Sequence, residues 1–291
     1  MHLVTFVRED GTHIGALQQR DGRQMIVDLN RAEPRLPNDM IAFLAGGDES
    51  RVLAAQALAD PPAEAVLDRN ALRLSAPIPR PGKIICIGLN YRDHAAESNQ
   101  PVPEYPTVFA KYSSCVIGPG ESIVIPRVTS QVDYEGELAV VIGRRARDVA
   151  EQDALSYVAG YAPFNDVSAR DYQGRTSQWT IGKTFDTFGP IGPALVTADE
   201  ISDPHSLDIR VTIGDDVLQS SNTRHLIFSI PQLIAYLSAV MTLEPGDVIA
   251  TGTPAGVGAA RKPARWLQPG ELVRVEIDGL GTLENPVVAS T

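Results

Sequence analysis

The chain has 291 residues, a formal net charge of -11, 43% hydrophobic residues and 21% charged residues. This length supports a large core, in one domain or in a large domain that carries a small one. The negative charge, without a long run of Lys or Arg, argues against a nucleic-acid partner. Two cysteines outside any Cys-x-x-Cys pair favour a reducing compartment over a disulfide framework.

The N-terminal part predicts a small α/β module over residues 1–75. Alternating segments near 3–7, 13–17 and 25–29 predict strands, and residues 49–58 predict a helix. The opening segment MHLVTFVREDGTHIGAL has neither the basic start nor the apolar run of a signal peptide. No stretch of the sequence approaches the ~20 apolar residues that cross a bilayer. We therefore expect a cytoplasmic protein with no membrane association.

A connector rich in proline and charge, residues 61–83, separates this module from the rest of the chain. The predicted second domain, residues 76–291, consists of short apolar runs punctuated by Gly and Pro, which is typical of strands. Helices are predicted at 151–160, which ends in a glycine, and at 230–243, which has a proline in its first turn. The predicted fold class is therefore α+β and strand-rich, with a few helices on the outside.

Residues 90–99, NYRDHAAESN, predict a short polar helix after an apolar strand. In such a helix His94 and Glu97 are three positions apart and share one face. A carboxylate beside an imidazole orients the ring and raises its basicity, which suits a general base. The alternative is an exposed helix whose two side chains face solvent.

Residues 133–143, DYEGELAVVIG, predict a strand with acids at its start that becomes apolar on both faces. Glu135 and Glu137 face the same side, about 7 Å apart at the backbone. They share a proton, bind a cation, or spread into water at a solvated strand end. Asp166 follows another apolar strand and is either a third oxygen ligand or the N-cap of a helix. Carboxylates suit Mg2+, and the absence of a His or Cys cluster argues against zinc.

Two further segments carry candidate polar groups. Lys183 lies among small, apolar and aromatic residues, so it either extends to the surface or projects into a cavity to meet a negative charge. Residues 250–258, ATGTPAGVG, form a Gly-rich loop whose amides and Thr253 could cradle an anion. This loop lacks the Gly-Lys-Ser/Thr ending of a phosphate-binding P-loop.

Five segments, in this order, resemble the successive signature blocks of the fumarylacetoacetate hydrolase family: IGLNYRDHAAE, DYEGELAVVIG, NDVSARD, GKTFDTFGPIGP and GDVIATGTPAGVG. The resemblance spans about residues 82–289. Three more segments resemble the branch that contains the animal domain-containing protein 2 of this family: KTFDTFGPIGPALVT, VLQSSNT and RKPARWLQPGELVRVEIDGLG. Residues 1–75 resemble the family much less specifically.

The resemblance implies a mixed β-sandwich roll for the catalytic domain, beside the small N-terminal domain, and a homodimer. It also implies one Mg2+ or Mn2+ ion per active site, with Ca2+ as a further candidate. The cation ligands that it implies are Glu135, Glu137 and Asp166. It leaves Asp133 without a role.

The remaining roles that the resemblance implies concern catalysis and the substrate. A water-activating pair on a lid would consist of His94 and Glu97. An oxyanion or enolate would be stabilised by Lys183, Gln173 and Thr253. Two side chains are expected around the tail of the substrate: Arg170 and Tyr172.

The expected substrate is a small 2-oxo or 2,4-dioxo acid, which can bind a cation through its carboxylate and 2-oxo oxygens. Presence of both His94 and Glu97 favours hydrolysis of a carbon–carbon bond in an acylpyruvate-type acid, and we rank this activity first. Three other reactions rank second: tautomerisation of oxaloacetate, decarboxylation of oxaloacetate, and isomerisation of 2-hydroxyhepta-2,4-diene-1,7-dioate. The branch resemblance favours the tautomerisation. A catalytically silent sensor is the third hypothesis. It would be favoured by the loss of an expected ligand or of the lysine, and all of these residues are present.

Overall fold

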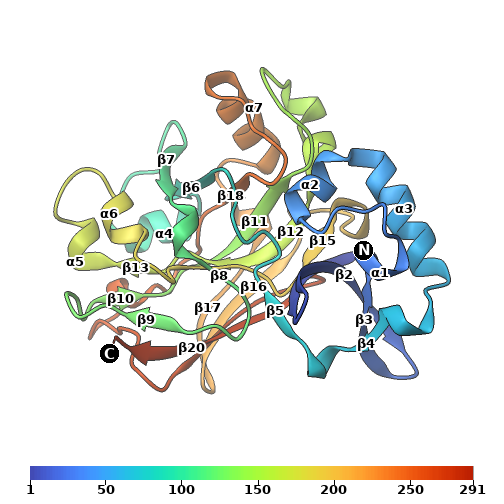
Figure 1. Cartoon of the computed structure of the whole chain (residues 1–291). Helices are drawn as coiled ribbons and strands as arrows, with labels where there is room; N and C mark the ends of the chain where they lie inside the picture. Colours follow the sequence, from blue (N-terminus) through green and yellow to red (C-terminus); the bar gives the residue numbers. More distant parts are fainter. Residues whose placement is uncertain (291) are drawn as a thin grey trace.

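The computed structural model describes residues 1–290, and it is rich in strands with few helices (Figure 1). The largest sheet in this part of the chain follows the order β4 (Val66–Asp68), β3 (Arg23–Asp28), β2 (Gly11–Arg20), β1 (His2–Arg8), β15 (Leu195–Thr197), β12 (Val158–Asn165), β11 (Gly136–Ile142), β18 (Val248–Ala250), β6 (Ile84–Gly88), β7 (Thr107–Lys111). Strand β5 (Arg73–Ser75) also pairs with β1. This sheet runs through the whole molecule.

A second sheet follows the order β17 (Asp216–Asn222), β16 (Asp208–Ile213), β19 (Leu272–Ile277), β20 (Gly281–Ala289), β9 (Ile123–Ile125). Two short pairs join β10 (Val132–Asp133) to β13 (Ser168–Ala169) and β8 (Val116–Ile117) to β14 (Gly189–Pro190). The α-helices are α1 (Leu29–Ala32), α2 (Met40–Ala45), α3 (Gly47–Ala59), α4 (Arg92–Glu97), α5 (Arg170–Gln173), α6 (Thr180–Lys183) and α7 (Ile230–Val240). Figure 1 shows α4, α5 and α6 at the end of the molecule away from α1–α3.

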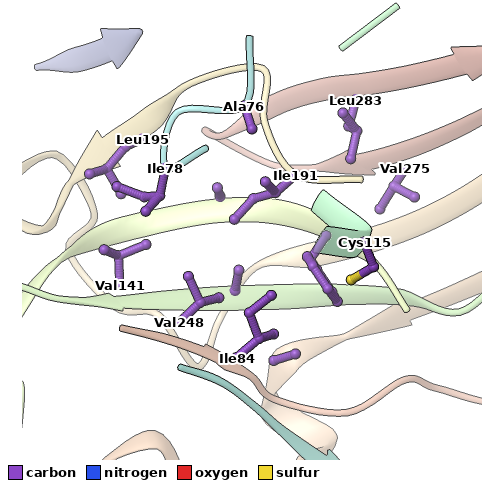
Figure 2. Close-up of a cluster of buried hydrophobic side chains, with 14 of the residues drawn as sticks. Ala76, Ile78, Ile84, Cys115, Val141, Ile191, Leu195, Val248, Val275 and Leu283 are labelled. Carbon is purple, nitrogen blue, oxygen red and sulfur yellow. The ribbon is translucent and has the colours of Figure 1, made fainter. Parts of the chain in front are cut away.

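The two large sheets pack on each other through buried aliphatic side chains. Figure 2 shows Val141 and Val248 of the first sheet in one cluster with Val275 and Leu283 of the second. All of these side chains are buried, so their burial removes a large apolar area from water. The strand-rich α+β fold predicted from the sequence is confirmed.

Strand β11 is buried on both faces, as its sequence predicts. Val141 and its neighbour Ala139 belong to the cluster between the sheets. Leu138 and Val140 point to the other face, where they join a second cluster with residues of α7. A strand in the middle of a covered sheet is apolar on both sides, and this explains why alternation is lost after the acids.

Helix α7 covers that second face. Ser229 and Gln232 form a reciprocal capping box at its start, and Pro231 occupies the first turn, where a missing N–H costs nothing. The helix ends at Val240, three residues before the predicted end, because the chain becomes extended and Leu243 pairs with Ala146. The predicted helix is confirmed in its position and start.

The predicted helix at 151–160 is wrong in its type and its end. Residues Glu151–Tyr157 form a 3-10 helix, and β12 begins at Val158. Gly160 lies inside β12, where a Cβ atom would lie 2.1 Å from the carbonyl oxygen of Val196. The glycine therefore permits close approach of two strands and does not end a helix.

The N-terminal strands and helix lie where the sequence predicts them, as β1, β2, β3 and α3. Strand β1 pairs with β15, so the sheet continues from this part of the chain into the rest. The division into residues 1–75 and 76–291 stays a prediction. No helix in residues 1–290 is both long enough and apolar enough to cross a membrane.

Candidate active site

Pairing of β11 with β12 brings three acids together. Gly136 lies opposite Asn165, so Glu135 and Asp166 flank the same end of the strand pair. Two hydrogen bonds fix this end, from the Asp166 amide to the Glu135 carbonyl (2.9 Å) and from the Glu135 amide to Asn165 Oδ1 (3.0 Å). One oxygen each of Glu135, Glu137 and Asp166 lies within 4.8 Å of the others. All three side chains are buried, which excludes a solvated strand end.

Lys183 lies against two of these acids. Its Nζ atom donates to Glu135 Oε2 at 2.7 Å and to Asp166 Oδ2 at 2.8 Å. The lysine is 2% exposed, so it does not extend to the surface. Burial opposes its charge, but Asp166 and Glu135 outweigh burial and raise the pKa of Lys183. Asp166 is not a helix cap either, because α5 begins four residues later after Ala169.

The negative charge of the three acids is not fully balanced by the neighbouring cations, and the excess falls on Glu137. Burial, Asp166 and Glu135 raise the pKa of the Glu137 carboxyl well above its ordinary value. Burial acts in the same sense on Glu135, but Lys183 and Arg170 outweigh it and lower the pKa of Glu135. Three converging carboxylates with surplus charge and no thiolate are a donor set that fits a hard divalent cation.

Arg170, the first residue of α5, extends the polar cluster. Its Nη1 atom lies 2.6 Å from Glu135 Oε1 and donates to Gln173 Oε1 at 3.0 Å. Its Nε atom donates to Asp133 Oδ2 at 2.8 Å. Its Nη2 atom is buried and has no protein partner within residues 1–290. A buried, unpaired donor on a guanidinium is available for an oxygen of a ligand.

Asp133 has a structural role that the sequence did not reveal. Its carboxylate accepts hydrogen bonds from the amides of Tyr134 (2.9 Å), Gly258 (2.7 Å) and Ala259 (2.9 Å), and from Arg170 Nε. The side chain is fully buried. Asp133 therefore fixes Arg170 and the loop beside it in one arrangement.

Replacing Asp133 with asparagine is expected to lower kcat/KM about 10-fold to 100-fold, the range for partners that orient a site. The amide lacks the charge that pairs with Arg170 and cannot accept at both of its positions. Steady-state kinetics and urea unfolding measure the two effects. Asp28→Asn is the matched control, because Asp28 is equally buried beside Arg8 and Arg31 in the N-terminal part. Equal kcat/KM losses in both variants would contradict a positioning role.

His94 and Glu97 form a hydrogen-bonded pair on α4, with 2.8 Å between His94 Nδ1 and Glu97 Oε1. The second oxygen of Glu97 accepts from the Gly256 amide at 2.9 Å. The side chains are 10% and 20% exposed, so the solvent-facing helix is excluded. Because Glu97 binds Nδ1, the ring nitrogen left for proton transfer is Nε2.

The Gly-rich loop binds carboxylates of the protein itself. The Gly252 amide donates to Glu137 Oε2 at 2.9 Å, and the Gly256 amide donates to Glu97. Both glycines have positive φ, 105° and 108°, which other residues rarely adopt. These two amides are thus already engaged by carboxylates of the protein, and binding of a substrate anion by this loop stays a prediction. The loop links the acids to the histidine pair.

Thr253, in the same loop, is also engaged. Its hydroxyl donates to the Gly136 carbonyl at 2.9 Å and accepts from Gln219 Nε2 at 2.8 Å. Tyr172 lies outside the cavity wall, where its ring meets Phe185 edge-on at 5.1 Å and stacks under Arg175. Thr253 therefore lies in the wall of the cavity, and Tyr172 does not.

Several of these groups line a cavity of about 520 Å³, whereas Asp133, Asp166 and Tyr172 lie outside its wall. The predicted residues in its wall are His94, Glu97, Glu135, Glu137, Arg170, Gln173, Lys183 and Thr253. Phe109 and Trp179 add an aromatic wall, with ring centroids 5.5 Å apart, and Trp179 packs on Gly88, where a Cβ would lie 2.3 Å from the ring. A larger hollow of about 840 Å³ borders β16 and β17, but it contains none of the buried acids.

Two residues near this cavity were missed in the sequence. Lys111 ends β7 and donates to Asp166, and a charged residue at the end of the apolar segment TVFAK was the available signal. Asn90 precedes α4 and binds the main chain at Phe228 and Thr251, which ties the start of this helix to the body. Both contacts join segments that are far apart in the chain.

The family model for the C-terminal region of fumarylacetoacetate hydrolase matches residues 83–288. The chain belongs to the fumarylacetoacetate hydrolase family. "Oxaloacetate tautomerase fahd2, mitochondrial" of Xenopus laevis is 48% identical over 292 residues, which cover 99% of this chain and 90% of that protein. "Oxaloacetate tautomerase FAHD2A, mitochondrial" of Homo sapiens is 45% identical and covers 96% of this chain and 88% of its own. The predicted family and branch are confirmed.

Two solved structures of this family share the fold over whole chains. Maleylpyruvate hydrolase from Sphingobium sp. SYK-6, in complex with manganese(II) ion and pyruvate, has a TM-score of 0.83 and 34% identity and covers all of both chains. The 2-hydroxyhepta-2,4-diene-1,7-dioate isomerase from Mycobacterium marinum has a TM-score of 0.79 and 33% identity, and it covers 100% of this chain and 99% of its own. This protein is therefore an enzyme of a family with hydrolase and isomerase members.

Proposed function

We propose that this protein is a divalent-cation-dependent oxaloacetate tautomerase, which interconverts the enol and keto forms. The observation that carries the reaction class is the His94–Glu97 pair at the wall of a cavity that Glu135, Glu137 and Lys183 also line. The substrate comes from the relatives, several of which carry the name oxaloacetate tautomerase at 44–48% identity. These names favour the activity that the sequence analysis ranked second.

In the proposed complex, Glu135, Glu137 and Asp166 would hold the cation. The cation supplies Lewis-acid stabilisation of negative charge on the 2-oxo oxygen. Lys183 Nζ would donate to the same oxygen as enolate charge develops, because a fixed donor in a buried site stabilises that charge strongly. Arg170 Nη2, the unpaired donor, would bind a carboxylate of the substrate.

His94 would carry the proton. In the keto-to-enol direction its Nε2 takes the proton from C3, and the C–H electrons form the C2–C3 double bond. The π electrons of the C2 carbonyl move to its oxygen, which gains a proton from solvent, and His94 then releases its proton to solvent. The return direction reverses each transfer and consumes no water. Glu97 stabilises the imidazolium that forms, and the Gly256 amide keeps Glu97 in place.

Hydrolysis of an acylpyruvate is the second candidate. The relevant observation is the 34% identity to a maleylpyruvate hydrolase. In this reaction the same histidine would take a proton from a water molecule that attacks the distal carbonyl. The bond between C3 and that carbonyl carbon would break, which releases a carboxylic acid and pyruvate enolate, and the enolate would gain a proton at C3.

The homodimer and the cytoplasmic location stay predictions. Several relatives are named as mitochondrial proteins.

The test is an assay with Mn2+ that follows the enol absorbance of oxaloacetate and, separately, pyruvate release from oxaloacetate, acetylpyruvate and fumarylpyruvate. The proposal predicts fast enol decay without pyruvate. Pyruvate from an acylpyruvate at a higher kcat/KM would replace the proposal by the hydrolase. Binding without turnover of any of these acids would support the silent sensor instead.

Replacing His94 with glutamine is expected to lower kcat about 10²-fold to 10⁴-fold, the usual contribution of a general base. Glu97→Gln is expected to cost less, because the imidazole stays in place and loses only its charged partner. Mn2+ affinity, measured by calorimetry, is expected to stay unchanged in both. His225→Gln, at an exposed position, is the control. Full activity of His94→Gln would exclude this residue as the base.

A further inference from the structure

Lys111 is a buried lysine behind the acid triad, for which neither the sequence analysis nor the proposed mechanism has a role. It is the last residue of β7, the strand at one edge of the largest sheet (Figure 1). The exposed fraction of its side chain is 0%. A lysine is almost never fully buried unless it is paired, so the partners of its ammonium group define its role.

Both partners of Lys111 lie at the end of β12. Its Nζ atom donates to Asp166 Oδ1 at 2.6 Å and to the Val167 carbonyl oxygen at 3.1 Å. The two acceptors belong to consecutive residues, so the ammonium group is fixed relative to the main chain that carries Asp166. On the other side, Ile84 pairs with Lys111 in the sheet and fixes its backbone.

The two oxygens of Asp166 have different partners. Oδ1 binds Lys111, whereas Oδ2 binds Lys183 at 2.8 Å. Lys183 also binds Glu135, so Oδ2 is the oxygen that faces the other acids. With Oδ1 held by Lys111, the carboxylate of Asp166 cannot turn away without taking the only carboxylate partner within residues 1–290 from a buried ammonium group, which is costly.

We infer that Lys111 is a positioning residue that holds Asp166 by Oδ1 and thereby presents Oδ2 to a divalent cation. This inference rests on the cation site of the proposed function. Lys111 is not in the wall of the cavity, and in this role it acts through Asp166. Outer partners of this kind orient a ligand and cost 10-fold to 100-fold in metal affinity when they are removed.

A purely structural ion pair would have a different signature. The chain contains such a pair, Lys83 with the buried Asp247 at 2.6 Å, next to strands β6 and β18 of the same sheet. Neither residue lies in the wall of the cavity. Lys83→Met is therefore the matched control, since it also leaves a buried aspartate without its lysine but does not touch the triad.

The experiment measures Mn2+ binding to metal-free protein by titration calorimetry and by the electron paramagnetic resonance signal of free Mn2+. It compares the wild type with Lys111→Met, Lys111→Gln and Lys83→Met, and thermal unfolding is recorded with and without Mn2+. We expect Lys111→Met to weaken Mn2+ binding 10-fold to 100-fold. Lys111→Gln keeps a donor and is expected to lie between it and the wild type. Lys83→Met is expected to unfold at a lower temperature with unchanged Mn2+ affinity.

Unchanged Mn2+ affinity in Lys111→Met overturns the inference. If Lys111→Met does not fold, Lys111→Gln decides: weakened binding supports the inference and wild-type binding overturns it. An equal loss of affinity in Lys83→Met overturns it too, because the effect then follows from removing the lysine partner of any buried aspartate. Failure of the wild type to bind Mn2+ is a separate result, which removes the cation site of the proposed function itself.

Discussion

Replacing Glu137 with glutamine is expected to abolish binding of the divalent cation and catalysis while making the metal-free protein more stable. Glu137 is buried, and its carboxylate accepts a hydrogen bond from the neutral Gly252 amide, whereas Glu135 and Asp166 accept from lysines. Burial and the two acids raise the pKa of Glu137, so at a pH above the ordinary pKa of glutamate folding costs either a buried charge or the uptake of a proton. Glutamine keeps the shape and avoids both costs.

The loss of function follows from the same charge. A carboxylate that contributes charge and an oxygen to the cation becomes a neutral amide, so the loss in affinity is expected to exceed the roughly 10-fold to 100-fold cost of removing an outer partner. Calorimetry with Mn2+ measures affinity, and unfolding of metal-free protein measures stability. Opposite changes of stability and function are characteristic of residues kept for function.

Glu276→Gln is the control, because Glu276 is an exposed glutamate on β19. It is expected to leave both quantities unchanged. Wild-type Mn2+ affinity in Glu137→Gln would contradict the assignment of this residue. A lower unfolding temperature of the metal-free variant would contradict the electrostatic account of the triad.

Replacing Lys183 with methionine is expected to lower kcat by about 10²-fold to 10³-fold, the effect of removing one donor to a developing oxyanion. Lys183 is the cation that joins Glu135 to Asp166 at 2.7 and 2.8 Å, and its Nζ atom also lies 5.0 Å from the centroid of the Phe109 ring. The metal-free variant is expected to unfold more easily, because two buried carboxylates lose a shared partner.

The change in kcat separates catalysis from binding. An interaction that forms only as charge develops lowers kcat with little effect on KM. Mn2+ binding is expected to persist in Lys183→Met, since the three acids remain. Steady-state kinetics with oxaloacetate measures both constants, and Lys262→Met at an exposed position is the control. Wild-type kcat in Lys183→Met would exclude it from enolate stabilisation.

The sequence predicted the parts of the site that lie within single segments. The strand with acids at its start and the helix with His94 and Glu97 follow from local periodicity, and the structure has both. Pattern alone left open whether these side chains face water. Their burial depends on the pairing of β11 with β12 and on the loop around Gly256, which are contacts between distant segments.

The roles of Asp133 and Lys111 depend entirely on contacts between segments that are distant in the sequence. Asp133 meets the Gly258 amide 125 residues away, and Lys111 meets Asp166 55 residues away. No periodicity within a segment encodes these pairs. The sequence around Gly160 predicts a helix end, but only the neighbouring strand shows that this glycine permits close packing.

The most direct test of the account is to strip the protein of metal and restore Mn2+ stepwise while following enol decay of oxaloacetate and pyruvate release. The account predicts no catalysed decay without metal, recovery that reaches a plateau at one Mn2+ per chain, and no pyruvate. Catalysed enol decay at the full rate in metal-free protein would contradict the cation site and the proposed function together.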